Sequence, residues 1–141
     1  MAADLRRASV VITGASSGIG RATALAFASS GARVTIAARR SSVLAGVAHA
    51  CERRGAEALA VPTDVTVPAA VSKLARAAVA EFGGIDIWIN NAGVGVFGPY
   101  ADAPLEYHRR IEVNLLGAMY GAYAVLPLFM RQGHGTLINT V

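Results

Sequence analysis

Cysteine, lysine and aromatic residues are scarce in this 141-residue chain. A single cysteine, Cys51, excludes an intrachain disulfide and a zinc site built from several cysteines, and no metal site is predicted. Lys73 is the only lysine, so twelve of the 13 basic residues are arginine, and with nine acidic residues the formal net charge is +4. Charged residues make up 16% and hydrophobic residues 54% of the chain, which excludes a disordered segment and provides enough apolar material for one core.

The excess positive charge is not concentrated in one segment. The arginines are dispersed from Arg6 to Arg131, without a dense basic stripe and without a nucleic-acid recognition motif. We therefore expect no nucleic-acid partner.

Two stretches resemble targeting or membrane segments. Two arginines precede the apolar run Ala8–Ile12, but this run is too short for a signal peptide and continues into a glycine-rich loop. The uncharged stretch between Glu112 and Arg131 has the length of a membrane span, yet it contains Asn114 and Pro127. A helix buried against protein explains it better, so we expect a cytoplasmic chain with no membrane partner.

Short apolar runs alternate with longer segments of helical period. Strands are predicted at Ala8–Thr13, Arg33–Ala38, Glu57–Val61, Ile85–Ile89 and within Gly133–Val141. Helices are predicted at Gly18–Ser30, from Ser41 to about Arg54 with Ser41 or Ser42 as the cap, from Thr66 or Val67 to Phe82, and from about Pro104 to Met130. This alternation predicts one α/β domain over residues 1–141, with a doubly wound (Rossmann-like) parallel sheet ordered 3-2-1-4-5.

The segment between the first strand and the first helix is rich in glycine. Its glycines, Gly14, Gly18 and Gly20, follow a G-x-x-x-G-x-G spacing instead of the common G-x-G-x-x-G. The physical requirements are the same: a sharp turn, close approach of a pyrophosphate to bare backbone, and close packing of the helix on the sheet. A plain turn in an Ala/Gly-rich protein is the alternative, but the position in the first strand–helix unit favours phosphate binding.

Four motifs together resemble one family. Besides Thr13-Gly14-x-x-x-Gly18-Ile19-Gly20, the chain contains Asp64-Val65, Asn90-Asn91-Ala92-Gly93 and Asn114-x-x-Gly117. Their order and spacing resemble those of the short-chain dehydrogenases/reductases, single-domain branch. The resemblance covers essentially all 141 residues and corresponds to the N-terminal half of that family, truncated after the fifth strand.

The resemblance implies a site for a nicotinamide cofactor. It assigns to the cofactor Gly14, Ser16, Ser17, Gly18, Ile19, Gly20, Asp64, Val65, Asn91, Ala92 and Gly93. In this assignment Asp64 accepts a hydrogen bond from the adenine amino group, for which an ordinary turn aspartate is the alternative. Asn90 is expected to brace the central strands instead. Parallel sheets of this kind bind ligands at the carboxyl ends of their strands, which is the same location.

The end of the second predicted strand indicates which cofactor is bound. An acidic residue there usually receives the ribose 2′-hydroxyl of NAD, but this chain has Ala38 followed by Arg39 and Arg40. Arg39 can donate two hydrogen bonds to a 2′-phosphate, so we expect NADP(H), with NAD(H) as the alternative. A solvated basic pair at a helix entrance is the competing explanation.

The resemblance also assigns Asn114 as the family's catalytic asparagine, which holds a water in a proton relay. A hydrogen-bonded asparagine at a helix interface is the alternative. The family's catalytic serine and its Tyr-x-x-x-Lys pair are not among these 141 residues, because none of Tyr107, Tyr120 and Tyr123 has a lysine four positions later.

These residues predict an oxidoreductase that transfers a hydride between NADP(H) and a small carbonyl or alcohol substrate, acting on CH-OH groups. Residues 1–141 would supply its cofactor-binding half, incomplete at the C-terminal end and inactive alone. A non-catalytic nucleotide-binding or sensor module is the alternative. In the segment 95–101, Phe97 and Tyr100 are the candidates for an apolar wall of the substrate pocket.

The last predicted helix suggests an oligomer. It carries a run of small residues, Gly117, Ala118, Gly121, Ala122 and Ala124, which permits close helix packing. The family commonly pairs this helix across a two-fold axis, so we expect a homodimer or homotetramer.

Overall fold

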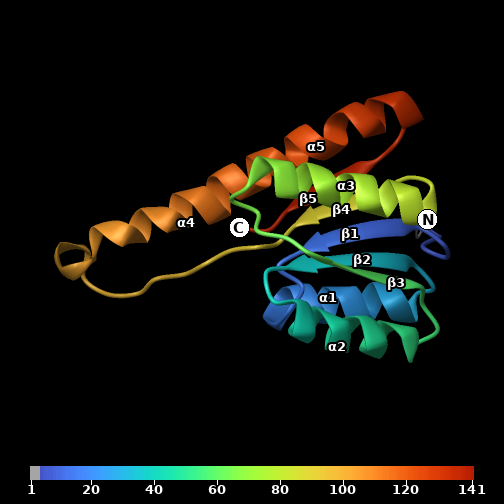
Figure 1. Ribbon diagram of the computed structural model, residues 1–141, viewed down its shortest axis with the longest axis horizontal. Helices are drawn as coiled ribbons and strands as arrows, with labels where there is room; N and C mark the ends of the chain where they lie inside the picture. The colour runs from blue at the N-terminus through green and yellow to red at the C-terminus, as the bar shows by residue number, and fades with distance from the viewer. Residues whose placement is uncertain (1–3) are drawn as a thin grey trace.

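The computed structural model describes residues 4–141, apart from the side chain of Glu106, and contains one five-stranded parallel sheet (Figure 1). Met1–Ala3, the start of the expected domain, lie outside the described residues. The sheet has the order β3-β2-β1-β4-β5, which confirms the predicted doubly wound topology. The strands are β1 (Ser9–Thr13), β2 (Arg33–Ala38), β3 (Ala58–Pro62), β4 (Ile87–Asn90) and β5 (Thr136–Asn139). The helices that cover the sheet are α1 (Gly18–Ser29), α2 (Ser41–Glu52), α3 (Pro68–Phe82) and α5 (Gly117–Gln132).

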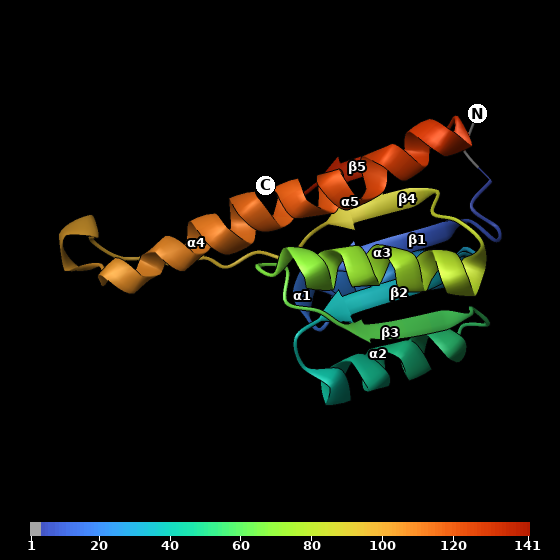
Figure 2. The ribbon, with the colours of Figure 1, turned by 45° about the horizontal axis from the view of Figure 1, so that its top comes forward.

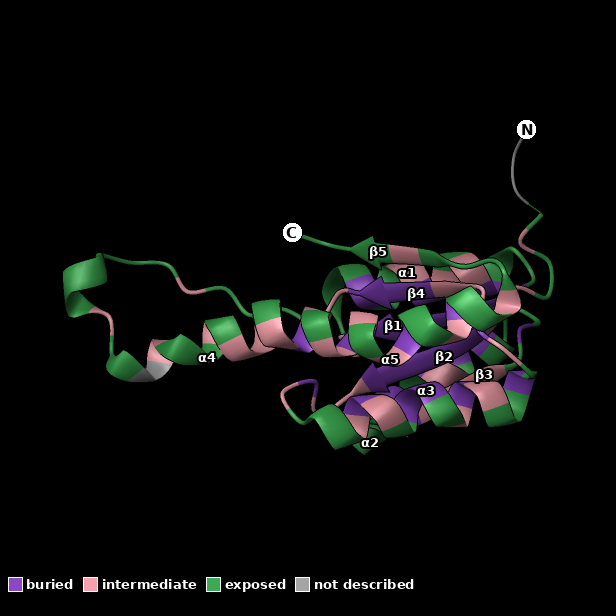
Figure 3. Ribbon diagram, turned by 90° about the horizontal axis from the view of Figure 1, so that it is seen from above, coloured by how far each residue is buried: buried purple, intermediate pink, exposed green. Residues whose placement is uncertain are grey.

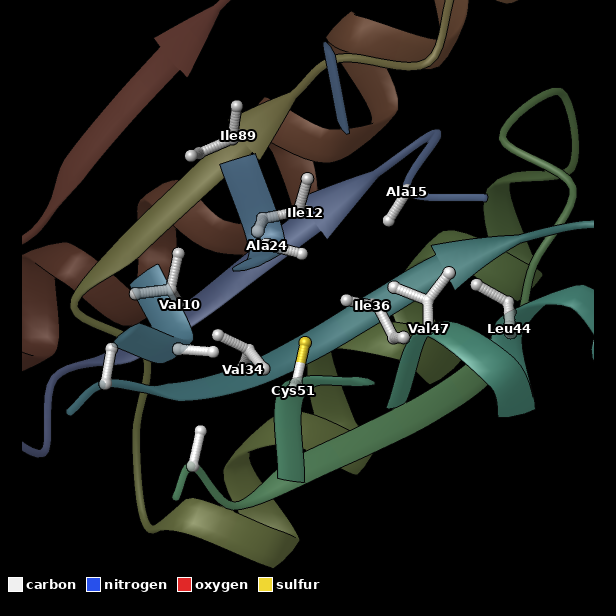
Figure 4. Packing of buried hydrophobic residues seen from close by; sticks show 13 residues of the cluster. Val10, Ile12, Ala15, Ala24, Val34, Ile36, Leu44, Val47, Cys51 and Ile89 are labelled. Atoms are coloured by element: carbon white, nitrogen blue, oxygen red, sulfur yellow. The ribbon is translucent and has the colours of Figure 1, made fainter. Parts of the chain in front are cut away.

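The sheet is covered on both faces, as its nearly continuous apolar strands predicted. Helices α1 and α2 lie on one face and α3 and α5 on the other (Figures 1 and 2). All five residues of β1 are buried: Val10 and Ile12 pack under α1 and α2 (Figure 4), and Val11 packs under α3 and α5. A strand with no exposed face needs apolar residues in succession, and β1 has them because its side chains alternate between two cores.

Several element boundaries differ from the sequence predictions for local reasons. Ser41 and Ser42 do not cap α2, because Arg40 occupies the capping position and makes no side-chain cap hydrogen bond. Likewise α3 begins at Pro68, with Val67 in the capping position, and not at Thr66 or Val67 as predicted. Strand β3 extends through Pro62. Proline has no N–H to donate to a neighbouring strand, and this is tolerated here because β3 lies at the edge of the sheet.

The predicted long helix is segmented at its start. Two short 3₁₀ turns, Tyr100–Asp102 and Leu105–His108, precede α4 (Arg109–Ile111), and a π-helical turn (Glu112–Leu116) joins α4 to α5. The α4 end of this continuous helix and the loop before it extend beyond the sheet (Figure 1). By length and composition alone, the helix from Arg109 to Gln132 is apolar enough to cross a membrane, and 22% of its 18-residue apolar window is buried inside the protein.

Two of the five small residues of α5, both glycines, lie against the protein's own core, while Ala118, Ala122 and Ala124 are half-buried. Gly117 and Gly121 are buried: a Cβ at Gly117 would lie 2.8 Å from Cγ2 of Val65, and one at Gly121 would overlap Oδ1 of Asn90. These glycines therefore let the helix approach its own domain, and the prediction that they face a partner is wrong. The outer side of the helix is exposed (Figure 3), and it carries larger apolar side chains. They are Ile111, Leu115, Met119, Tyr123, Leu126 and Met130, each at least 44% exposed.

Candidate functional site: a cavity at the carboxyl ends of the strands

The glycine-rich loop between β1 and α1 leaves the sheet through a sharp turn. Gly14 and Gly18 have φ angles of 66° and 55°, in the left-handed region that glycine adopts without a steric penalty. A Cβ at Gly14 would lie 2.7 Å from Cα of Ala92, so a side chain there would push the loop away from the segment after β4. A Cβ at Gly20 would overlap the carbonyl oxygen of Gly14. Bare backbone at Gly14 and Gly20 is therefore required by packing, while Gly18 is required by its backbone angle.

Thr13 and Asn91 join this loop to the end of β4. The Thr13 hydroxyl oxygen accepts hydrogen bonds from the backbone N–H groups of Asn91 and Ala92, both at 3.1 Å. In return, Nδ2 of Asn91 donates to the carbonyl oxygens of Thr13 and Gly14, at 3.1 and 3.3 Å. Because Thr13 is buried, these bonds fix the relative position of the two loops without competition from water.

The N-terminus of α1 is open to an anion. Ser17 occupies the capping position with extended backbone angles but makes no side-chain cap hydrogen bond, and the first turn contains no acidic residue. The first backbone N–H groups of a helix have no intrahelical partner and carry partial positive charge. This end of α1 therefore offers donors to a phosphate group.

Asp64, directly after β3, is held in a tight turn. Its Oδ1 accepts hydrogen bonds from the backbone N–H of Thr66 at 2.9 Å and from the Thr66 hydroxyl at 2.7 Å. These two bonds outweigh the opposing effect of burial and hold the pKa of Asp64 below its usual value, and the positive charges of Arg39 and Arg109 make smaller contributions in the same direction. The turn-aspartate explanation is thus correct for one carboxylate oxygen, and Oδ2 makes no hydrogen bond within the described part of the chain.

Asn114 lies in the π-helical turn and binds the loop after β4. Its Oδ1 accepts a hydrogen bond from the Val94 N–H at 2.8 Å, and its Nδ2 donates to the Val94 carbonyl at 2.9 Å. The amide therefore mimics a paired strand and holds the segment that follows Gly93. The widened helical turn carries Asn114, and such turns are frequent at functional sites.

Asn90, in contrast, faces the interior. Its Oδ1 accepts a hydrogen bond from Nε1 of Trp88 at 2.7 Å, while its Nδ2 donates to the Ala118 carbonyl and to Oδ1 of Asn139. Asn90 thereby ties β4 to α5 and to β5. The expectation that it braces the central strands agrees with these contacts.

A cavity of about 730 Å³ lies where these segments meet. Ten of the twelve residues assigned to the cofactor line it: Gly14, Ser16, Ser17, Ile19, Arg39, Asp64, Val65, Asn91, Ala92 and Gly93. The other two, Gly18 and Gly20, belong to the loop but are not among its lining residues, and neither is Asn114. The cavity therefore spans the distance from the helix N-terminus to the ends of β2 and β3. Among the described residues, no cluster of histidine, cysteine and acidic side chains could hold a metal ion.

Sequence reasoning missed one wall of the cavity, which comes from the segment 94–113. Its lining residues are Val94, Val96, Tyr107, Arg109, Arg110 and Val113, and Thr63 lies beside Asp64. One signal could have indicated this wall. Arg109 and Arg110 stand at the N-terminal end of a helix, where the helix dipole disfavours positive charge, so another interaction has to compensate. Phe97 and Tyr100 lie outside this cavity and are 98% and 89% exposed.

The comparison with protein families agrees with this geometry. The family model for short chain dehydrogenases matches residues 8–141, which includes every strand and helix described above. This chain belongs to the short-chain dehydrogenase family.

Relatives of this short-chain dehydrogenase are longer than the chain itself. An uncharacterized oxidoreductase of Bacillus subtilis, YxnA, is 39% identical over 132 residues, which are 92% of this chain and 37% of the relative. A short-chain type dehydrogenase/reductase from Mycobacterium marinum has a crystal structure with a TM-score of 0.93 and 40% identity, covering 98% of this chain and 57% of that one. The chain thus spans between about a third and somewhat more than half of the length of these relatives.

Structures of similar short-chain dehydrogenases contain both kinds of nicotinamide cofactor. One from Burkholderia phymatum, solved in complex with NAD, has a TM-score of 0.94 and 33% identity and covers 99% of this chain and 50% of that one. An alcohol dehydrogenase from Thermococcus sibiricus, complexed with 5-hydroxy-NADP, has a TM-score of 0.84 and 35% identity, over 92% of this chain and 56% of that one.

The junction at Thr13 generates a stability prediction. Replacing Thr13→Val keeps the shape but leaves the part-buried N–H groups of Asn91 and Ala92 without their acceptor, so we expect the free energy of unfolding to fall by about 1–3 kcal/mol. The measurement is urea unfolding of both proteins, with Thr13→Ser as the variant that restores the hydroxyl.

The neighbouring strand provides a matched control for this variant. Thr35 on β2 is also fully buried, but its hydroxyl has no hydrogen-bond partner among the described residues. Thr35→Val should therefore leave the stability unchanged or raise it by about 1 kcal/mol. Equal losses for the two valine variants would show that the Thr13 hydroxyl does not hold the loops together.

Proposed function

We propose that this chain is the cofactor-binding part of an oxidoreductase that transfers a hydride between NADP(H) and a carbonyl or alcohol substrate. The observation that carries the proposal is the cavity bounded by the glycine-rich loop and by the ends of β2, β3 and β4. Doubly wound sheets bind dinucleotides at this position, where the connections of neighbouring strands leave in opposite directions.

Different residues that line the cavity would bind different parts of the cofactor. The N–H groups at the start of α1, together with Ser16 and Ser17, would bind the pyrophosphate. The free Oδ2 of Asp64 would accept a hydrogen bond from the adenine amino group, and Val65 would pack against the ring. When bound, the nicotinamide supplies the hydride donor or acceptor. Asn114 acts indirectly, since its side chain positions the Gly93–Val94 backbone beside the cavity.

The preference for NADP(H) over NAD(H) rests on charge at the end of β2. Ala38 offers no carboxylate for a ribose 2′-hydroxyl, while Arg39 and Arg40 both line the cavity. A guanidinium can donate two parallel hydrogen bonds to a phosphate, and a nearby carboxylate would instead repel it. Similar short-chain dehydrogenases have been solved with either type of cofactor, so the residues of this chain decide the proposal.

Two dissociation constants test the preference. We expect the chain to bind NADPH at least about tenfold more tightly than NADH, because a charge-assisted contact to the extra phosphate is worth about 1.5–3 kcal/mol. The double variant Ala38→Asp with Arg39→Ala should invert this order. Titration by intrinsic Trp88 or by NADPH fluorescence gives both constants, and equal or tighter binding of NADH by the unmodified chain would refute the preference.

A non-catalytic nucleotide-binding module is the second candidate. The family's serine and Tyr-x-x-x-Lys pair are not among these 141 residues, where Lys73 is the only lysine, so the residues of this chain are common to both candidates. Both candidates predict that this chain by itself binds cofactor without turnover. They differ in whether a longer protein that contains this chain carries the missing groups. For either candidate we propose a cytoplasmic protein with no nucleic-acid or membrane partner, since α5 packs on β4 and α3 of its own domain.

We further propose that a second copy of this chain covers the outer side of α4 and α5, either in a homodimer or in each dimeric half of a homotetramer. The apolar stripe defined by Ile111, Leu115, Met119, Tyr123, Leu126 and Met130 repeats every three or four residues over about five helical turns. A two-fold axis across this helix would bring identical stripes together, as an isologous interface requires. Monomeric proteins rarely leave an apolar surface of this length uncovered.

Sedimentation equilibrium tests this interface. The unmodified chain should sediment as a dimer or larger, whereas Met119→Asp with Tyr123→Asp should sediment as a monomer, because two charges would be buried without partners. Ser42→Asp adds charge on the exposed start of α2 and should leave the assembly unchanged. A monomeric unmodified chain would rule out the interface.

A further inference from the structure

The cavity wall has a strong excess of positive charge. Arg39 and Arg40 approach from the connection between β2 and α2, and Arg109 and Arg110 approach from the start of α4. The only carboxylate among the described residues that line the cavity is Asp64, so four guanidiniums face one carboxylate. Neither an adenine ring nor a ribose carries charge to neutralise the remaining three. The wall is therefore complementary to phosphate groups beyond those bound at the start of α1.

The two arginines of α4 differ in their contacts. The Nε of Arg110 donates a hydrogen bond to the Tyr107 carbonyl at 3.2 Å, and its guanidinium lies 5.5 Å from the centre of the Tyr107 ring. Arg109 makes no hydrogen bond or ion pair with the side chains that the structure describes, and it is exposed. Arg110 is thus held in place by its own turn of helix, while Arg109 is an exposed side chain at the cavity wall.

Arg109 and Arg39 act on the same carboxylate from different elements. Both charges help to keep the pKa of Asp64 low, although the hydrogen bonds from Thr66 have the larger effect. Both arginines also line the same cavity as Asp64, Arg39 from the end of β2 and Arg109 from the start of α4. Asp64 marks the adenosine end of the cavity, where Arg39 is already the candidate for the 2′-phosphate. Arg109 therefore reaches that end from a second wall.

From this arrangement, and resting on the proposed function, we propose that Arg109 determines cofactor specificity together with Arg39. Its guanidinium binds the phosphate on the adenosine ribose from the α4 side, while Arg39 binds it from the β2 side. Recognition of the phosphate then requires two elements that are 70 residues apart in sequence. A phosphate has three acceptor oxygens that can each receive guanidinium donors, so two arginines can bind it at the same time.

Binding of cofactor fragments to the 141-residue chain tests this role. Adenosine 2′,5′-bisphosphate carries the discriminating phosphate and adenosine 5′-monophosphate lacks it. Arg109→Gln should weaken binding of the bisphosphate about tenfold and change the dissociation constant of the monophosphate less than about twofold. Arg109→Lys should weaken binding of the bisphosphate by a smaller factor, since lysine keeps the charge but not the paired donors. Arg131→Gln removes the same charge from the exposed far end of the same helix and should change neither constant.

The outcomes separate this inference from the proposal on which it rests. If the unmodified chain prefers the bisphosphate and Arg39→Gln abolishes that preference while Arg109→Gln does not, NADP(H) specificity stands and the role of Arg109 is refuted. Equal weakening of both nucleotides by Arg109→Gln also refutes it, because the arginine would then contact the adenine or the 5′-phosphate. If the unmodified chain does not prefer the bisphosphate, both the inference and the NADP(H) preference fail. Thermal unfolding of each variant verifies that its fold is intact.

Discussion

The hydrogen-bonded junction between Thr13 and Asn91 is the interaction on which the cavity depends. β1 and β4 are adjacent parallel strands, but the chain leaves β1 toward α1 on one face and leaves β4 toward the opposite face. The two connections would separate freely beyond the last pair of strand residues. Hydrogen bonds to the Thr13 hydroxyl and from the Asn91 side-chain amide instead hold the two connections together at their starts. The space that remains between the connections is the cavity.

Close packing around glycine extends the same logic to the helices. Gly20 lets α1 approach the Gly14 carbonyl, and Gly121 lets α5 approach Asn90 and Trp88. In both cases the helix lies closer to the sheet than any side chain would allow, which holds the ends of β1 and β4 rigidly. Gly117 and Gly121 thus face inward along α5 together with Val125 and Phe129, and other large apolar residues are left on its outer side. An alanine- and glycine-rich composition is a consequence of this packing.

The arginines serve two separate purposes. Away from the cavity, some of them bind carbonyl oxygens at the ends of helices: Arg33 donates to Phe82 at the end of α3, and Arg54 donates to Ala50 at the end of α2. Four others line the cavity and lack comparable numbers of acidic neighbours. A net charge of +4 therefore includes a local excess at the site, in addition to surface charge that the structure does not explain.

Patterns along the sequence could predict the strands and the motif residues, but not what tertiary structure alone brings together. The run Arg33–Ala38 located β2 to the residue, since Gly31 ends the preceding helix and Arg39 and Arg40 follow the last apolar position. The prediction of a serine cap for α2 was wrong because Arg40 takes the capping position. The inward orientation of Gly121 depends on Asn90 and Trp88, which lie about 30 residues earlier in the chain. Two arginines at the start of a helix are a signal for an anionic ligand, but only the path of the chain after β4 brings Arg109 to the same cavity as Asp64.

Amide hydrogen exchange of the 141-residue chain, with and without saturating NADPH, tests most directly that the cavity at the ends of these strands is the cofactor site. Exchange reports which backbone segments a ligand protects from opening. The account predicts slower exchange in residues 14–20, 39–40, 64–65, 91–94 and 109–113, with unchanged exchange in the outer residues of α2. Protection absent from these segments, or confined to the apolar stripe of α5, would contradict it.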